Sequence, residues 1–200
     1  MLKLPENIQA LIFDCDGTLV DNMLLHLLSW QQAFELYGES FTAEILAKTS
    51  GIPLIETIEY YNSTFGANLD PALVAAHKDI FFEKMLHHVV PVEDLCQLAF
   101  DYKDILPMSV VSGSNRESVD TSLIQAGVKE LFSIVLTSDD PFKGKPAPDL
   151  FLEAARLMGV DPEYCVVFED GEAGMIGARA AGMHVLDVQP VVDKQRLNKN

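Results

Sequence analysis

The chain has 200 residues, of which 48% are hydrophobic and 22% charged, as in an ordinary soluble globular protein. Its formal net charge of −16 argues against a nucleic-acid partner, because surfaces that bind nucleic acid need concentrated Lys and Arg. No run approaches the roughly 20 apolar residues that span a bilayer, and the amino terminus does not look like a signal peptide. Three widely spaced cysteines predict neither a disulfide framework nor a zinc site. We therefore expect no membrane partner and a cytoplasmic location.

The first predicted element is a buried strand over Ala10–Phe13, followed by two aspartates with one residue between them. Side chains on a strand alternate faces at about 3.3 Å per residue, so Asp14 and Asp16 would emerge on one side about 6.6 Å apart. In a parallel sheet they would lie at the carboxyl end of the strand, where open α/β sheets bind ligands. Two acids there favour a hard cation such as Mg²⁺, although a solvated acidic turn has the same pattern.

Residues 22–90 show helical patterns only. These patterns cover Met23–Tyr37, Thr42–Lys48, Pro53–Tyr61 and Pro71–His87. Asp70 is a candidate N-cap of the last helix, with Pro71 at its first position. A helical block of this length directly after the first strand is best explained as a small bundle inserted into an α/β core. We expect a core domain of residues 1–21 and 91–200, and a second domain of residues 22–90, called the helical insertion below.

Beyond the helical insertion, apolar runs alternate with helical patterns. The runs are Met108–Val111, Ile134–Leu136, Cys165–Phe168 and His184–Val188, and the helical patterns are Ser114–Ala126, Pro148–Met158 and Gly171–Ala181. Such alternation indicates βαβ units and a parallel sheet. The predicted fold class is therefore α/β, with a Rossmann-like parallel sheet flanked by helices. The polar tail at residues 192–200 is expected to fray.

Polar residues follow two of these later strands. Ser112, Gly113 and Ser114 stand where a hydroxyl and the backbone N–H groups that begin a helix can receive a phosphate oxygen, although such a turn is often only a helix cap. Lys145 follows the third strand and is fixed by the next proline. Its ammonium is suited to neutralising phosphate oxygens or a charged nucleophile.

Two adjacent acids, Glu169 and Asp170, directly follow the apolar fourth strand. Two like charges 4 Å apart repel by roughly 4 kcal/mol at an effective dielectric constant of about 20. If Asp14, Asp16, Glu169 and Asp170 converge on one edge of the sheet, they would destabilise the fold unless a cation lay among them.

Taken together and in this order, the segments DCDGT, VVSGS, KGKPAPDLF and VVFEDGEAGMIGARAAGM resemble the motifs of the haloacid dehalogenase superfamily of phosphotransferases. The resemblance covers essentially the whole chain, and is strongest to β-phosphoglucomutase and its phosphatase relatives that act on small sugar phosphates. It implies that the helical insertion is the family's α-helical cap domain, that Mg²⁺ is the cofactor, and that the partner is a small phosphorylated metabolite. We expect a monomer.

The resemblance also implies catalytic roles. Asp14 would be the nucleophile that forms an aspartyl-phosphate, and Asp16 the acid/base that protonates the leaving oxygen and then deprotonates water. Ser112 would hydrogen-bond the phosphoryl group, and Lys145 would hold its charge beside Asp14.

Metal and substrate ligands follow from the same resemblance. Asp14, Asp170 and the backbone carbonyl of Asp16 would bind Mg²⁺, with Glu169 assisting. Candidate substrate residues are Gly113, Ser114 and Arg116 near the phosphate, and Asn22 and His26, one helical turn apart, where the helical insertion meets the core.

Three alternatives bear on the function. A sugar-phosphate mutase of the β-phosphoglucomutase type uses a lysine and an arginine around the loop that corresponds to residues 49–54, and neither cation stands at the matching places here, which favours hydrolysis. A non-enzymatic phospho-receiver module places its acceptor aspartate after a middle strand and has no helical insertion. A cysteine-dependent phosphatase needs an arginine six residues after its nucleophile, but Asp21 stands six residues after Cys15.

Overall fold

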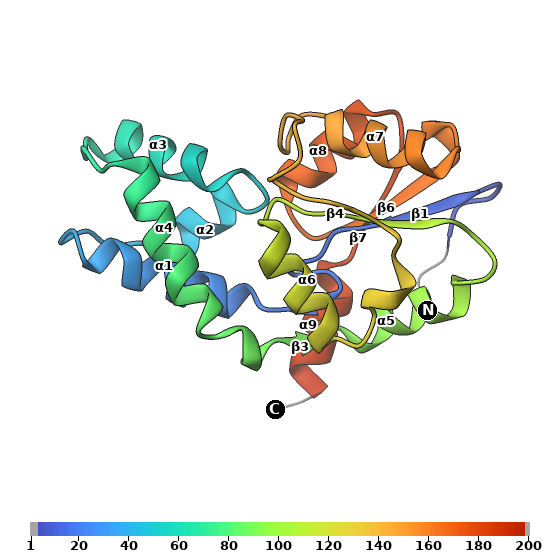
Figure 1. The fold of residues 1–200 in the computed structure, drawn as a ribbon, viewed down its shortest axis with the longest axis horizontal. Helices are drawn as coiled ribbons and strands as arrows, with labels where there is room; N and C mark the ends of the chain where they lie inside the picture. Colours follow the sequence, from blue (N-terminus) through green and yellow to red (C-terminus); the bar gives the residue numbers. More distant parts are fainter. Residues whose placement is uncertain (1–3, 199–200) are drawn as a thin grey trace.

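The computed structural model describes residues 4–198 and contains a five-stranded sheet with helices on both faces (Figure 1). Its strands are β1 (Ala10–Phe13), β4 (Met108–Val111), β5 (Ile134–Leu136), β6 (Cys165–Glu169) and β7 (His184–Asp187). Their order is β5-β4-β1-β6-β7, and every neighbouring pair is parallel. The α/β fold with a Rossmann-like parallel sheet is therefore confirmed, and only the ends of β6 and β7 differ from the predicted strands, by one residue each.

Different helices cover the two faces of the sheet (Figure 1). Successive side chains of a strand point to opposite faces, so each strand contributes residues to both apolar clusters. One face carries α5 (Glu93–Tyr102), α6 (Arg116–Gln125) and α9 (Gln189–Asn198), and the other carries α7 (Asp149–Met158) and α8 (Glu172–Ala180). Leu11 and Phe13 join the apolar cluster beneath α5, α6 and α9, whereas Ile12 joins the cluster beneath α7 and α8. Short 3-10 turns, η2 (Lys129–Leu131) and η3 (Pro162–Tyr164), precede β5 and β6.

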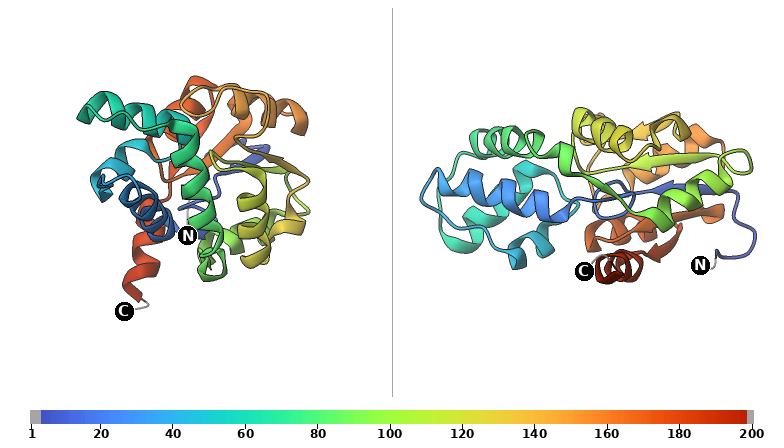
Figure 2. Two further views of the ribbon diagram at one scale, coloured as in Figure 1. Left: turned by 60° about the vertical axis from the view of Figure 1, so that its left-hand side comes forward. Right: turned by 90° about the horizontal axis from the view of Figure 1, so that it is seen from below.

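The helical insertion lies at one end of the molecule, beside the sheet rather than on either face (Figure 2). It comprises α1 (Met23–Glu35), α2 (Ala43–Thr49), α3 (Leu54–Phe65), α4 (Pro71–Glu83) and the 3-10 turn η1 (Leu86–His88). Its own apolar cluster includes Trp30, Phe34, Phe41 and Tyr61. Asp70 caps α4 by accepting hydrogen bonds from the next two available backbone N–H groups, as the sequence predicts.

Two chain connections join the helical insertion to the core, and they pair with each other as the short antiparallel strands β2 (Val20–Asp21) and β3 (Val90–Pro91). Sequence patterns do not predict this ribbon, because each strand has only two residues. The domain boundaries predicted at residues 21/22 and 90/91 fall at this ribbon.

The expectation that residues 192–200 fray is wrong for residues 192–198, which form most of α9; residues 199 and 200 lie outside the described part of the chain. Val192 is buried in the core cluster. The Gln195 amide accepts a hydrogen bond from the Glu93 N–H (2.8 Å) and donates one to the Pro91 carbonyl (2.9 Å), and Arg196 contacts the Asp21 carboxylate at 2.6 and 3.0 Å. These long-range contacts stabilise a helix whose local sequence is polar. Within residues 4–198, no helix is both long and apolar enough to cross a bilayer.

The core cluster generates a stability prediction on α6. Leu123 is fully buried and Ile124, the next residue, is 63% exposed. We expect Leu123→Ala to lower the free energy of unfolding by about 2–5 kcal/mol, through lost burial and the cavity that remains. Ile124→Ala, the matched control, should change it by no more than about 0.5 kcal/mol. Urea titration followed by circular dichroism measures both, and equal effects would contradict this assignment of the core.

Candidate active site

The polar residues singled out in the sequence meet at the carboxyl edge of the sheet. Asp14 follows β1, Ser112 follows β4, and Glu169 ends β6. Since β1 lies between β4 and β6 in a parallel arrangement, the carboxyl ends of these strands are adjacent. The segment after β5 contributes Lys145, so four distant parts of the chain supply one site.

Lys145 is the positive centre of this site. Its Nζ lies 2.6 Å from Asp14 Oδ1 and 2.7 Å from Glu169 Oε2, and all three side chains are buried. Burial disfavours the ammonium, but the two carboxylates outweigh it and hold the pKa of Lys145 above its ordinary value. Lys145 therefore stays charged and fixes both acids.

One lysine does not neutralise the acids around it. Burial and the neighbouring Glu169 charge raise the pKa of Asp14 well above its ordinary value despite Lys145, and the same two causes raise the pKa of Asp170 to about 7. Ligand oxygens of Asp14, Glu169 and Asp170 lie within 4.8 Å of one another. Three hard oxygen donors with excess negative charge fit a divalent cation of the Mg²⁺ type.

Asp170 is positioned by the turn after β1. Gly17 has a φ of +80°, and a methyl group on it would lie 2.2 Å from Asp170 Oδ2, so glycine there leaves room for this carboxylate. The Thr18 hydroxyl donates to Asp170 Oδ1 at 3.3 Å. Thr18 is a site residue that the sequence analysis did not single out, although its place in the DCDGT motif is a usable signal.

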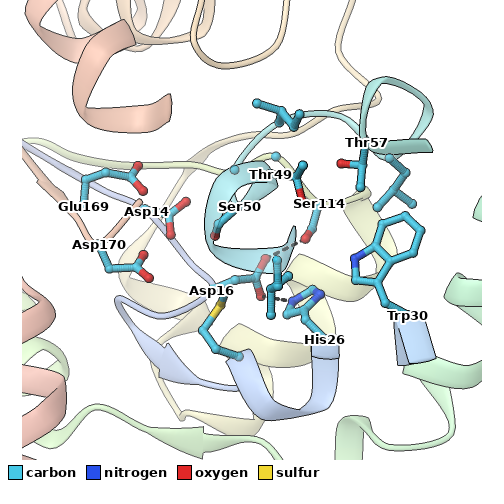
Figure 3. A pocket seen from close by; sticks show the side chains of 16 residues that line it. Asp14, Asp16, His26, Trp30, Thr49, Ser50, Thr57, Ser114, Glu169 and Asp170 are labelled. Atoms are coloured by element: carbon cyan, nitrogen blue, oxygen red, sulfur yellow. Dashed lines mark hydrogen bonds and ion pairs between the residues drawn. The ribbon is translucent and has the colours of Figure 1, made fainter. Parts of the chain in front are cut away.

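Asp16 has a separate set of partners (Figure 3). Its carboxylate accepts hydrogen bonds from Asn22 Nδ2 and Ser114 Oγ, both at 2.6 Å, and a longer one from Ser112 Oγ at 3.4 Å. His26 Nε2 lies 3.4 Å away. Burial opposes ionisation, but the charge and hydrogen bond of His26 and the bonds from Asn22 and Ser114 hold the pKa of Asp16 below its ordinary value.

His26 also packs into the helical insertion. Its ring stacks on Phe82 with centroids 4.1 Å apart, and the Nζ of buried Lys78 lies 4.3 Å from the same Phe82 ring. Burial and the Lys78 charge lower the pKa of His26, although the nearby Asp16 carboxylate opposes them. Lys78 was not anticipated, because a lone lysine in an amphipathic helix gives no local signal.

A cavity lies between the carboxyl edge of the sheet and the helical insertion (Figure 3). The core supplies Asp14, Asp16, Gly113, Ser114, Glu169 and Asp170 to its lining. The helical insertion supplies Met23, His26, Trp30, Leu46, Thr49, Ser50, Gly51, Ile52, Leu54 and Thr57. Most of the second set was not predicted, since lining residues on a loop and on apolar helix faces look like ordinary packing residues.

The structure brings together nearly all the sequence-predicted site residues. Ser112, Asn22 and Lys145 do not line the cavity themselves but hydrogen-bond residues that do. Arg116 is not brought to the cavity: its guanidinium donates to the Val135 carbonyl at 2.6 Å and to the Asp140 carboxylate at 2.9 Å. These bonds hold it at the start of α6.

Comparison with known proteins agrees with this geometry. A protein-family model described as haloacid dehalogenase-like hydrolase matches residues 11–188. The chain belongs to this family. Among haloacid dehalogenase-like hydrolases, it is 34% identical over 184 residues to the fructose-1-phosphate phosphatase YqaB of Escherichia coli strain K12, covering 92% of this chain and 98% of that protein.

Two further proteins are similar to this chain, one in sequence and one in structure. The β-phosphoglucomutase of Bacillus subtilis strain 168 is 27% identical over 193 residues, covering 90% of this chain and 83% of the mutase. The crystal structure of a hydrolase from Pseudomonas syringae has a TM-score of 0.84 at 19% identity, covering 93% of this chain and 90% of that chain, and shows the same fold. The expected membership of the haloacid dehalogenase superfamily is thus confirmed.

The packing of α8 against the site yields a prediction at Gly174. A methyl group there would lie 2.0 Å from Glu169 Oε2. Alanine normally stabilises a helix interior by about 0.5–1 kcal/mol relative to glycine, but Gly174→Ala should displace Glu169 from Lys145 and lower the melting temperature. Ala173→Gly on the same helix should cost only the propensity difference of about 1 kcal/mol. Calorimetry compares the two, and a raised melting temperature for Gly174→Ala would refute the crowding.

Proposed function

We propose that this protein is a Mg²⁺-dependent phosphatase that hydrolyses a small phosphomonoester, in particular a sugar phosphate, through an aspartyl-phosphate on Asp14. Membership of the family and the phosphatases among the relatives make it a phosphoric monoester hydrolase. The observation that carries the finer proposal is Asp14 held at 2.6 Å by Lys145 beside Asp16, in a cavity that the helical insertion lines from the other side. The helical insertion would act as the cap of the site.

In the first step, a carboxylate oxygen of Asp14 attacks phosphorus, and the bond from phosphorus to the substrate's ester oxygen breaks. Asp16 must carry a proton when the substrate is bound; it gives this proton to the ester oxygen, so the leaving group departs as a neutral alcohol, and it recovers a proton in the second step. Lys145 neutralises charge on Asp14 and on the equatorial phosphoryl oxygens, and the Ser112 hydroxyl hydrogen-bonds one of them. Dividing one displacement into two in this way lowers each barrier.

In the second step, water attacks the phosphorus of the aspartyl-phosphate and Asp16 takes its proton. The bond between phosphorus and Asp14 breaks, inorganic phosphate leaves, and the Asp14 carboxylate is restored. Hydrogen bonds from Asn22 and Ser114 orient Asp16 for both transfers and favour the ionised form that acts as base.

Asp14, Asp170 and the backbone carbonyl of Asp16, with Glu169 assisting, would hold the Mg²⁺ ion. When bound, the ion supplies positive charge to the phosphoryl oxygens and offsets the repulsion between an anionic substrate and a chain of net charge −16. Bound there, the ion would also oppose the effect of burial and of Glu169, which raise the pKa values of Asp14 and Asp170.

Hydrolysis is favoured over the mutase reaction by the lining of the cavity. A mutase must hold a second phosphate while the first is transferred, but among residues 4–198 the lining contains neither Lys nor Arg. A panel of sugar phosphates tests this, with β-glucose 1-phosphate followed by both free phosphate and glucose 6-phosphate. Phosphate release without glucose 6-phosphate supports the phosphatase. Glucose 6-phosphate without free phosphate would replace it by the mutase.

Removing the nucleophile gives a sharp test of the mechanism. Asp14→Asn should reduce phosphate release to the background rate with the fold intact, because the amide is not a competent nucleophile. Asp104→Asn is the matched control, since that side chain is 86% exposed, and should keep the wild-type rate. Acid quenching during turnover, followed by peptide mass spectrometry, should show one phosphoryl group on the Asp14 peptide. Turnover by Asp14→Asn at the wild-type rate would exclude the mechanism.

Metal removal tests the cofactor separately. EDTA should abolish phosphate release and added Mg²⁺ should restore it. Asp170→Asn should raise the Mg²⁺ concentration needed for half-maximal activity at least tenfold, because a carboxylate ligand is lost. Full activity of the wild type in EDTA would show that no divalent cation is required.

A further inference from the structure

The connection between α2 and α3 is the part of the helical insertion that meets the catalytic edge of the core. It consists of residues 50–53, of which Ser50, Gly51 and Ile52 line the cavity. In Figure 1 this connection extends from the helical insertion towards the core. We call residues 50–53 the closing loop.

Two core glycines, Gly113 and Gly144, face the closing loop at very short range, and a third, Gly171, lies at ordinary contact distance. A methyl group on Gly113 would lie 2.7 Å from the Gly51 carbonyl oxygen, and one on Gly144 would lie 2.7 Å from Cγ of Pro53. On Gly171 it would lie 3.6 Å from the Ser50 carbonyl oxygen. Separations below 3.0 Å are essentially never made by real side chains, so Gly113 and Gly144 leave space for nothing but hydrogen.

Backbone conformation does not explain these glycines. Gly51 itself has a φ of +83°, which favours glycine, but Gly113 and Gly144 are not among the glycines with positive φ. Their requirement is therefore one of space. Each follows a different strand of the sheet, β4 or β5, and each is a chain neighbour of a residue in the proposed mechanism, Ser112 or Lys145.

We propose that Gly113 and Gly144 are positioning residues, which form a seat for the closing loop and so set the closed position of the helical insertion over the site. This rests on the proposed function. The seat aligns the loop directly with the segments that carry Ser112 and Lys145, so closure and completion of the catalytic site are one event. A methyl group on Gly51 would lie 3.7 Å from Lys145 Cδ, so the backbone of the loop also runs close to Lys145.

The Gly144 contact is the one that can be tested by removal and rescue. The pyrrolidine ring of Pro53 is tied to the backbone and cannot swing aside, so Gly144→Ala should push the closing loop away. We expect kcat/KM to fall at least tenfold. Pro53→Ala removes the obstructing ring atoms and alone should stay within about threefold of wild type. The double variant Gly144→Ala/Pro53→Ala should recover to within about threefold of Pro53→Ala. Lys143→Ala, an exposed neighbour in the same loop as Gly144, should keep the wild-type value.

A second readout needs no turnover. Trp30 is the single tryptophan of the chain, is 3% exposed and lines the cavity on the side of the helical insertion. Gly144→Ala should increase quenching of its fluorescence by acrylamide, and the double variant should restore protection. If Gly144→Ala shows the quenching and the kcat/KM of the wild type, the proposed seat is wrong.

The outcomes separate this inference from the function on which it rests. If the double variant stays as impaired as Gly144→Ala, the substitution acts through Lys145 rather than through the closing loop, and the proposal is wrong. If the wild type releases no phosphate from any substrate of the panel, the proposed function fails, while the acrylamide measurement still tests the seat.

Discussion

The contact of Lys145 with Asp14 and Glu169 is the interaction on which the rest of the structure depends. Breaking a buried ion pair by removing one partner typically costs about 3–5 kcal/mol, since the remaining charge stays buried and unpaired. Here two carboxylates share one ammonium, and Asp14 is 131 residues from Lys145 in the chain. The parallel sheet brings these segments together, because β1 lies at its centre, and the pairing in turn makes two acids tolerable at its buried edge.

The excess of carboxylates over cations in the site links the stability of the fold to the binding of a ligand. Four carboxylates line the cavity and Lys145 pairs with two of them, Asp14 and Glu169, so the protein alone is left with excess negative charge where an anionic phosphate is to bind. The helical insertion contributes mostly apolar residues and His26 to the lining, and within residues 4–198 it adds neither Lys nor Arg there. A divalent cation would offset the repulsion between these carboxylates. Excluding water from the site would strengthen every charge interaction within it.

The strands and the acids were predictable from sequence, because both depend on local pattern. Apolar runs define β1, β4 and β6, and polar residues at their ends must meet once the sheet is parallel. Contacts that join distant segments without a periodic signal were not predictable: the β2–β3 ribbon, the anchoring of α9, the burial of Lys78, and the approach of Pro53 to Gly144. Arg116 shows that closeness in sequence can also mislead. Its neighbours Ser112 and Ser114 contact Asp16, but its own guanidinium binds Asp140 instead.

The attachment of α9 to the β2–β3 ribbon has a consequence for synthesis of the chain on the ribosome. The helical insertion is contiguous and its apolar cluster can form as soon as residue 81 has emerged. β1 has been made by then, but β4 and β6 on either side of it have not, and Arg196, which binds Asp21 across 175 residues, comes last of all. A nascent chain therefore carries a folded helical unit next to an unpaired apolar strand until β4 (Met108–Val111) has emerged, and this interval is when chaperone protection of the protein matters most.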